Sequence, residues 1–97
     1  MKWTVKFSRY ATKQTQKINK RLLRVFQLLI EDLISDGPML SNKWSNFGKL
    51  KGVGDRELWH SHLIKGKPTY VCCWEVIDKL NRVIEVYYVG SHEKAPS

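Results

Sequence analysis

Two histidines separated by one residue lie in a stretch, residues 57–64, where apolar and polar side chains alternate as in a strand. His60 and His62 would therefore project from the same face of that strand. Imidazole titrates near neutral pH, so it can accept or release a proton without a large pKa shift. The third histidine, His92, follows the last expected strand and stands beside Glu93. These residues are our candidates for general acids and bases.

Lysines flank these histidines in the sequence, and cations beside imidazoles suit phosphoryl-transfer chemistry because negative charge grows on the phosphate in the transition state. A half-exposed structural histidine is the plainer alternative. A zinc site is another, because two histidines in this spacing can ligate one ion together with His92, Cys72, Cys73 or an acid. No C-x-x-C or H-x-x-x-H spacing supports zinc, so we expect no metal. The flanking lysines are Lys49, Lys51, Lys65 and Lys67.

The net charge of the chain lies entirely in its first third. The 97 residues include 17 Lys and Arg against 9 Asp and Glu, for a formal net charge of +8. Residues 1–30 carry all of this excess, because they contain no acid, whereas residues 31–97 are balanced. Such segregation indicates a polyanion or an acidic partner. The bases in the helical part of this segment are Lys13, Lys17, Lys20, Arg21 and Arg24.

The length and composition fit one domain spanning residues 1–97. The hydrophobic content of 42% is too high for a disordered chain. No apolar run approaches the roughly 20 residues that cross a bilayer, and the N-terminus lacks the apolar run of a signal peptide. Cys72 and Cys73 are adjacent, so they form no disulfide framework, and we expect one in the core and the other modestly exposed. We therefore expect a cytoplasmic protein with no membrane contact.

The first expected element is a short strand at residues 3–7, where apolar and polar side chains alternate. Trp3, Val5 and Phe7 would face a core, and Ser8 would cap a following helix. To join the sheet formed by the later strands, this strand needs a long crossover, which the helical region supplies.

A helical region follows, because residues 9–35 repeat apolar side chains along one helical face. The polar stretch at 17–20 can divide it into a helical hairpin. The Asp-Gly-Pro sequence at 36–38 ends it, since glycine adopts left-handed conformations and proline cannot continue a helix. Residues 39–56 predict a loop anchored on the core by Trp44, Phe47 and Leu50.

Three strands complete the chain, at residues 57–64, 69–77 and 83–89, with short turns between them and an irregular tail. Tyr87 and Tyr88 would point to opposite faces of the last strand. The predicted fold class is α+β: an N-terminal strand, a helical hairpin, then a three-stranded antiparallel meander with the helices on one face.

Four local motifs occur in a recognisable order. They are the basic helical hairpin ending in Asp36-Gly37-Pro38, the loop Trp44-Ser45-Asn46-Phe47-Gly48-Lys49-Leu50, the strand pair at residues 60–71, and the ending at residues 88–96. Together they resemble the RelE/ParE toxin superfamily over nearly the whole chain. The resemblance implies a RelE-like fold and a toxin of a bacterial or archaeal type II toxin–antitoxin system. RelE-like members enter the ribosomal A site and cut mRNA, whereas ParE-like members poison DNA gyrase.

The resemblance also assigns roles to particular residues. RelE-like toxins carry basic residues where this chain has His60 and His62, and a basic or acid/base residue where it has His92. The chain departs from the pattern at Thr69 or Tyr70, where an arginine is often found. It also ends in a serine near the place where many relatives have a catalytic tyrosine.

The resemblance implies a ribosome-dependent mRNA endoribonuclease without a metal or other cofactor. A base would remove the proton from a ribose 2′-hydroxyl, which attacks the adjacent phosphorus, and an acid would protonate the leaving 5′-oxygen. We expect His60 or His62 as base and His92 as acid, or the reverse. Glu93 belongs to the same group, and Tyr70 would orient the scissile phosphate. This mechanism requires the three imidazoles to meet in one hollow, with the lysines and the basic first third binding RNA phosphates.

The implied partners are an acidic antitoxin, which would form a hetero-oligomer with this chain, and the ribosome with mRNA in its A site. Two alternatives stay open. The first is a ParE-like gyrase-inhibiting toxin, which needs no acid or base. The second is a catalytically inactive protein-interaction module. Blocked replication with intact mRNA would select the first alternative, and expression without growth arrest would select the second.

Overall fold

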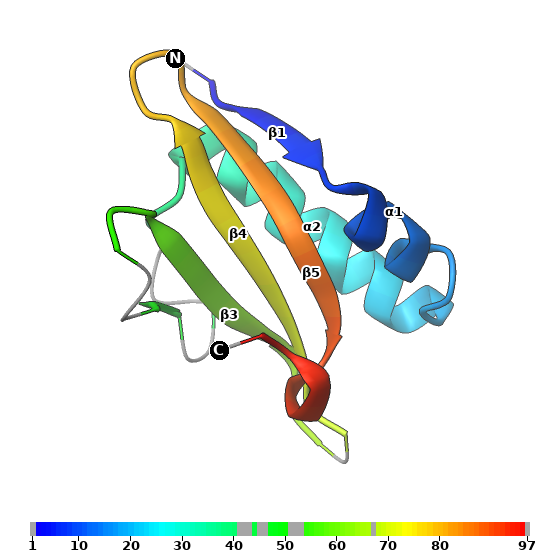
Figure 1. The fold of residues 1–97 in the computed structure, drawn as a ribbon. Helices are drawn as coiled ribbons and strands as arrows, with labels where there is room; N and C mark the ends of the chain where they lie inside the picture. Colours follow the sequence, from blue (N-terminus) through cyan, green and yellow to red (C-terminus); the bar gives the residue numbers. More distant parts are fainter. Residues whose placement is uncertain (1, 41–43, 45–46, 51–53, 67, 97) are drawn as a thin grey trace.

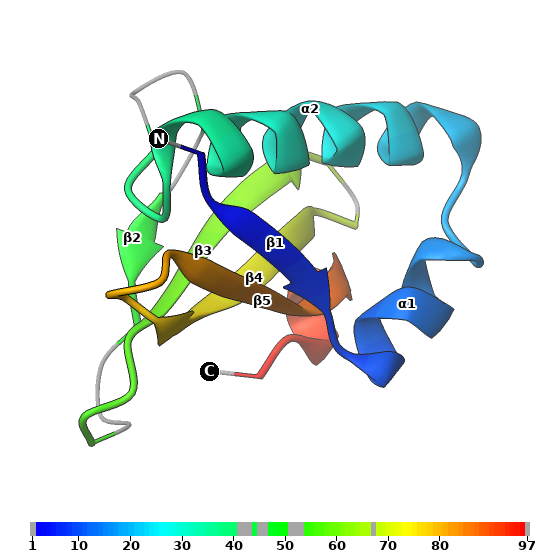
Figure 2. The same cartoon turned by 90° about the horizontal axis from the view of Figure 1, so that it is seen from above.

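A computed structural model shows a sheet with a long helix across one face and a short helix beside one edge (Figures 1 and 2). The structure describes residues 2–40, 44, 47–50, 54–66 and 68–96. The predicted α+β class is confirmed. Its elements are β1 (Thr4–Phe7), α1 (Arg9–Thr15), α2 (Lys20–Asp36), β2 (Gly48–Lys49), β3 (Leu58–Ile64), β4 (Tyr70–Asp78), β5 (Val83–Ser91) and the 3₁₀ turn η1 (His92–Lys94).

The sheet has five strands in the order β1-β5-β4-β3-β2. The predicted antiparallel meander of β3, β4 and β5 is confirmed. β1 joins its β5 edge in parallel, with Thr4 opposite Val83 and Phe7 opposite Val86. β2 pairs antiparallel with β3 at the other edge, inside the segment predicted to be a loop. Two residues are too few to show a period, which is why the sequence did not reveal β2.

The helical region divides into two helices at its polar stretch, as predicted. The Ser8 side chain accepts a hydrogen bond from the Ala11 N–H at 3.0 Å, and the Asn19 side chain accepts one from the Leu22 N–H at 2.8 Å. Each cap satisfies a backbone donor that has no partner inside its helix. Neither of the described helices is long and apolar enough to cross a membrane.

The main core lies between α2 and one face of the sheet. Leu29 and Leu33 of α2, Trp74 of β4 and Ile84 of β5 are all fully buried there. The Trp74 indole N–H donates to the carbonyl of Pro38 at 3.3 Å, so its polar atom has a partner despite its burial. This core holds α2 across the strands that carry the candidate residues.

Two of the three predicted loop anchors pack on this core. The Trp44 indole N–H donates to the Asp32 carboxylate at 2.7 Å, and the Phe47 ring stacks on Trp59 with 5.1 Å between centroids. Leu50, the third, instead lines a hollow on the opposite face of the sheet. Leu50 follows the last residue of β2, whose side chain faces the core. Successive side chains of an extended chain alternate between faces, so the Leu50 side chain points to the opposite face.

Phe7 is more exposed than predicted, with 42% of its surface accessible. Its ring contacts Phe26 of α2, with 6.0 Å between centroids. Both rings line an open groove of about 470 Å³ between β1 and the two helices. Trp3 and Val5, by contrast, pack against the core as predicted.

A β-bulge in the middle of β5 changes which face two tyrosines occupy. Cys73 pairs with Tyr88, but the next residue, Trp74, pairs with Val86, so Tyr87 is an extra residue in the ladder. Tyr87 and Tyr88 both pack with Cys73 on the face away from α2. The prediction that they point to opposite faces is therefore wrong, because simple alternation fails at a bulge.

The β5 edge is protected along its length by two different elements. β1 covers it as far as Phe7, and then the Gln14 side chain of α1 accepts a hydrogen bond from the Val89 N–H at 2.8 Å. β5 continues to Ser91, past its predicted end, and residues 92–94 form η1 instead of an irregular tail. The extra length of β5 is what carries the third histidine back to the sheet.

The end of α2 depends on Gly37. Its φ is +86°, and a Cβ there would lie 2.7 Å from Trp3 Nε1. Gly37→Ala should therefore lower the free energy of unfolding by about 1–3 kcal/mol of backbone strain, plus the cost of displacing the indole. Denaturant unfolding measures the loss. Gly54→Ala is the matched control, since its φ is +68° but a Cβ there would have no contact within 4 Å among the described residues. Equal losses in both variants would contradict the role of Trp3.

Candidate functional site

The three histidines lie together on the face of the sheet away from α2. The ring centroids of His60 and His62 are 6.5 Å apart, and those of His62 and His92 are 5.2 Å apart in an edge-to-face arrangement. The first two stand on β3, and the third begins η1. The fold thus brings together imidazoles from two separate parts of the sequence.

The strand register explains this convergence. His62 pairs with Val71 on β4, and Val71 pairs with Gly90 on β5. His92 comes two residues later, where its N–H donates to the carbonyl of Thr69 at 2.7 Å. This hydrogen bond holds the start of η1 against the beginning of β4, so the histidine stays over the sheet.

A second, smaller core supports η1 from beneath. Val71, Cys73 and Tyr88 are buried on this face, and Ala95 of the tail packs against them. The Tyr88 hydroxyl donates to the carbonyl of Ser91 at 2.7 Å. The residue immediately before the third histidine is therefore held by both packing and a hydrogen bond.

Gly90 gives the side chains of this region room to meet. A Cβ at this position would lie 2.9 Å from the Tyr88 hydroxyl oxygen and 3.1 Å from Gln14 Nε2. Any larger residue would have to displace one of these two side chains. Gln14 and Tyr88 thus close over β5 just ahead of His92.

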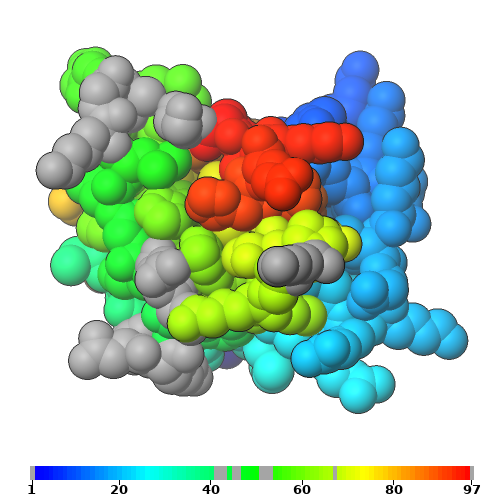
Figure 3. Space-filling view, turned by 90° about the horizontal axis from the view of Figure 1, so that it is seen from below, coloured from blue at the N-terminus to red at the C-terminus, as the bar shows by residue number. Residues whose placement is uncertain are grey.

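His92 separates two hollows. The smaller, about 190 Å³, is lined by the imidazoles of His60 and His92 and by apolar side chains. The larger, about 650 Å³, is lined by Thr69, Ser91 and Glu93 among others. Figure 3 views the molecule from this end, with the C-terminal segment, in orange and red, between the β3–β4 region in green and yellow and the helical hairpin in blue. A ligand can therefore approach the imidazoles from solvent.

Burial and positive neighbours lower the pKa of both strand histidines. For His60 the main cause is burial, followed by repulsion from His92. For His62 the causes are burial and then repulsion from His92, His60 and Lys65. Because each effect disfavours the charged imidazolium, both rings are predominantly neutral at pH 7 and able to accept a proton.

The structure does not bring Tyr70 and Lys49 to the histidines. Tyr70 precedes Val71 on β4, so alternation directs its side chain to the α2 face. Lys49 is paired with Trp59, and its ammonium lies 5.9 Å from the centroid of that ring, which belongs to the main core. Although these two residues lie near the histidines in the sequence, their side chains are not on the face of the sheet that carries the histidines.

Other predicted residues do lie near the cluster. Lys65 is close enough to His62 to lower its pKa, and Glu93 is exposed in η1 beside the larger hollow. Lys51 and Lys67 lie outside the described residues, as does the C-terminal serine. Lys65 is therefore the flanking lysine whose closeness to an imidazole the structure documents.

Most of the basic residues of the first third lie on the helical hairpin, and the others, Lys2 and Lys6, lie before α1. Figure 3 views the molecule from the end that η1 and the β3–β4 turn form, and the helical hairpin, in blue, lies at the right of that view. A polyanion that reached the histidines would therefore meet this hairpin too. The exposed bases on it are Arg9, Lys13, Lys17, Lys20, Arg21 and Arg24.

Both cysteines are buried, so the expectation that one would be modestly exposed is wrong. Cys72 lies in the main core and Cys73 in the smaller one, because the tail covers the second face. Burial raises the pKa of Cys73 to about 11, against a hydrogen bond with Tyr87 that lowers it. A buried, protonated thiol is a poor nucleophile.

The sequence did not predict an ion pair that lies at the other end of this face. Arg56 donates to both carboxylate oxygens of Glu75, at 2.8 and 2.9 Å. These bonds lower the pKa of Glu75 and keep its charge neutralised. The alternation of β4 would have placed Glu75 on this face, but nothing local in the sequence marks Arg56 as its partner.

The geometry also bears on the zinc alternative. The described part of the chain contains no group of three or more His, Cys, Asp and Glu side chains arranged to hold a metal ion. The two histidines on β3 are separated by 6.5 Å between ring centroids, and the third lies edge-on to one of them. What the arrangement does offer is adjacent proton donors and acceptors.

Solved structures with the same fold are RelE toxins, whereas no protein-family model and no curated protein sequence matches the chain. An archaeal RelE–RelB complex from Pyrococcus horikoshii OT3 is similar with a TM-score of 0.76 and 24% identity, over 98% of this chain and 100% of that chain. A mutant of the E. coli toxin RelE in the free state has a TM-score of 0.65 and 20% identity, over 98% and 88%. The intact E. coli RelBE toxin–antitoxin complex has a TM-score of 0.57 and 17% identity, over 95% and 99%. The predicted RelE-like fold is confirmed.

The lowered histidine pKa values predict how stability depends on pH. As pH falls below about 6.5, the unfolded chain protonates before the folded one, so the free energy of unfolding should decrease until the folded pKa values of His60 and His62 are passed. Replacing both histidines by asparagine should flatten the curve in this window. Denaturant unfolding between about pH 7.5 and about pH 5 measures it. Glu75 and Asp78, whose pKa values are also lowered, act at lower pH. An unchanged slope in the double variant would contradict the assignment.

Proposed function

We propose that this chain is the toxin of a type II toxin–antitoxin pair and that it cleaves mRNA on the ribosome. The observation that carries the proposal is the grouping of three imidazoles beside open hollows at one end of the sheet. The RelE fold and the basic helical hairpin at the same end support it.

The spacing of two rings suits in-line attack by a ribose 2′-hydroxyl. The attacking and leaving oxygens are bound to the same phosphorus, so their base and acid must stand within several ångströms of each other. His62 and His92 meet that condition, with 5.2 Å between ring centroids. His60 Nε2 instead lies 3.7 Å from the Cβ position of Gly48, so this ring is turned towards β2. We assign His60 to positioning.

In the proposed reaction, His62 takes the proton of the 2′-hydroxyl because its lowered pKa keeps it neutral. The 2′-oxygen bonds to phosphorus, the bond from phosphorus to the 5′-oxygen breaks, and His92 gives a proton to that leaving oxygen. The products are a 2′,3′-cyclic phosphate and a 5′-hydroxyl. Lys65 stabilises the charge that develops on the phosphate.

The helical hairpin would bind ribosomal RNA. Its bases have no acids among residues 1–30 to neutralise them, and phosphate contacts of this kind give strong, salt-dependent affinity. The same unbalanced charge suits an acidic antitoxin, which would compete with RNA for the hairpin. Two of the similar solved structures are complexes of RelE with RelB, which supports a partner of this kind.

His92→Ala should lower cleavage by roughly 10²–10⁴-fold and remove growth arrest, since one proton-transfer group is lost. Mapping of mRNA 5′ ends after induction, with and without translating ribosomes, measures this. The side chain is exposed, so thermal unfolding should stay close to that of the wild type. Lys94→Ala, in the same turn, is the matched control.

Three results would redirect the proposal. Undiminished cleavage by His92→Ala removes this histidine from the mechanism. Growth arrest by the wild type with intact mRNA and blocked replication selects a gyrase-directed toxin. Expression of the wild type without growth arrest selects an inactive interaction module.

The charge of the hairpin can be tested separately. Changing Lys17, Lys20 and Arg21 to glutamate should weaken sedimentation with ribosomes and reduce the slope of log affinity against log salt. A co-expressed acidic antitoxin should also relieve the growth arrest caused by this variant less than it relieves the growth arrest caused by the wild type. Lys79→Glu is the control, because this exposed lysine lies in the β4–β5 turn. Equal salt slopes for the triple variant and the wild type would refute the assignment.

A further inference from the structure

Tyr10 of α1 is an exposed aromatic residue held in a fixed position. Its side chain stacks on Tyr88 of β5, with 6.3 Å between ring centroids and an interplanar angle of 28°. Yet 61% of the surface of Tyr10 stays accessible, whereas only 3% of Tyr88 does. One face of the Tyr10 ring is therefore supported by the protein while much of the ring is open to solvent.

The supporting ring is itself rigidly held. Tyr88 packs in the smaller core with Val71 and Cys73, and its hydroxyl donates to the Ser91 carbonyl. It therefore cannot move away when a ligand presses on Tyr10. The same residue contacts both the exposed ring and the segment that positions His92.

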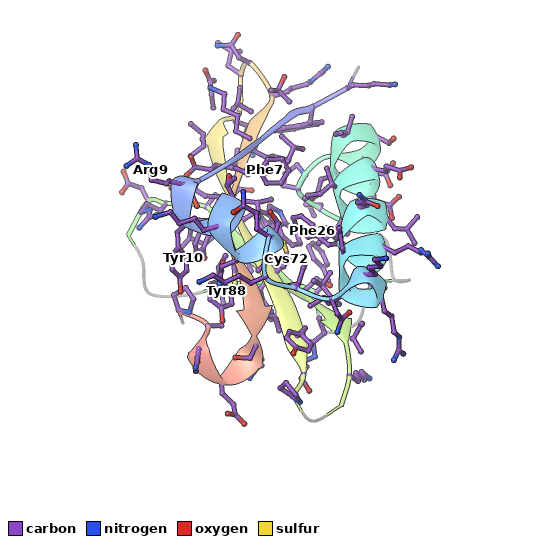
Figure 4. The ribbon with its side chains drawn as sticks, turned by 90° about the vertical axis from the view of Figure 1, so that its right-hand side faces the viewer. Phe7, Arg9, Tyr10, Phe26, Cys72 and Tyr88 are labelled. Carbon is purple, nitrogen blue, oxygen red and sulfur yellow. The ribbon has the colours of Figure 1, made fainter. Side chains whose placement is uncertain are left out.

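The register places this aromatic stack close to the histidines. Tyr88 pairs with Cys73, and Cys73 pairs with His60, so the outer two residues are two strand spacings apart, about 10 Å. Figure 4 shows Arg9, Tyr10 and Tyr88 on the side of the sheet away from α2. A single strand of RNA lying across this face would pass from the imidazoles to Tyr10.

The chemistry around Tyr10 suits a nucleotide. Arg9 precedes it and is exposed, and residues 1–30 contain no acid that would repel a phosphate. An exposed aromatic face beside a guanidinium is the usual platform for an unpaired base, with the cation taking the adjoining phosphate.

We propose that Tyr10, supported by Tyr88, is a stacking subsite for one unpaired base of single-stranded RNA, adjacent to the nucleotides bound at the histidines. The inference rests on the proposed function and adds to it a defined binding position outside the reacting groups. Arg9 binds the phosphate next to the stacked base. The subsite holds the strand in register without reading sequence, because every base has a stacking face.

The test uses binding without cleavage, so that it does not depend on the histidines. The probe is a short single-stranded RNA with 2′-O-methyl riboses throughout, which cannot undergo 2′-hydroxyl attack. A series of such oligonucleotides lacks the base at one position at a time. Fluorescence anisotropy at low salt gives the dissociation constant of each with the wild type, Tyr10→Ala and Tyr10→Phe.

The wild type should bind the intact probe roughly 5- to 150-fold more tightly than Tyr10→Ala does, the equivalent of about 1–3 kcal/mol for one stacked base. Removing the base at one position of the probe should weaken its binding to the wild type by a similar factor and leave its binding to Tyr10→Ala almost unchanged. Tyr10→Phe should behave like the wild type because the ring is kept. Leu80→Ala is the control for an exposed apolar side chain far from the site, since Leu80 lies in the β4–β5 turn with 91% exposure.

The inference fails if base removal costs the wild type and Tyr10→Ala the same factor at every position. It also fails if the wild type shows no binding of the intact probe. These outcomes are distinct from failure of the proposed function. Cleavage that survives His92→Ala would overturn the assignment of His92 as the acid but leave the stacking subsite intact. Loss of cleavage in His92→Ala, combined with equal costs of base removal in the wild type and Tyr10→Ala, would support the acid and overturn the stacking subsite.

Discussion

Four consecutive residues of β4, from Val71 to Trp74, are buried because this strand is covered on both faces. α2, Trp44 and Phe47 cover one face, and η1 with the tail covers the other. An exposed second face would leave Val71 and Cys73 in water, at a cost that grows with the apolar area exposed. The C-terminal segment must therefore fold back over the sheet, and that return is what sets His92 beside the histidines of β3.

The segments that cover the two faces of β4 form two surfaces with different properties. The first third of the chain packs its apolar stripe on the main core and turns its unbalanced bases outward, so it suits binding of a polyanion. The second face keeps imidazoles partly buried, which lowers the pKa of His60 and His62 and keeps them neutral. Figure 3 shows both surfaces in one view, with the helical hairpin at the right of η1 and the β3–β4 turn.

Periodicity was enough to predict the meander, the helical hairpin and the shared face of His60 and His62. What it could not predict depends on pairing between distant segments. The bulge at Tyr87 exists only relative to β4, and β2 exists only because it pairs with β3. The failure for Lys49 is of the same kind: pairing with Trp59 decides its face, and nothing nearby in the sequence does.

α1 connects the basic helical hairpin with the face of the sheet that carries the histidines. Its Gln14 side chain accepts the hydrogen bond that β1 leaves unmade on Val89, and Tyr10 stacks on Tyr88. Gly90 is the point where these contacts converge, since any side chain there would meet both Gln14 and Tyr88. A displacement of α1 would therefore shift Tyr88, and with it the Ser91 carbonyl to which the Tyr88 hydroxyl donates a hydrogen bond. A partner that bound the helical hairpin, such as the proposed RNA or antitoxin, would therefore act on an element in direct contact with the segment that positions the third histidine.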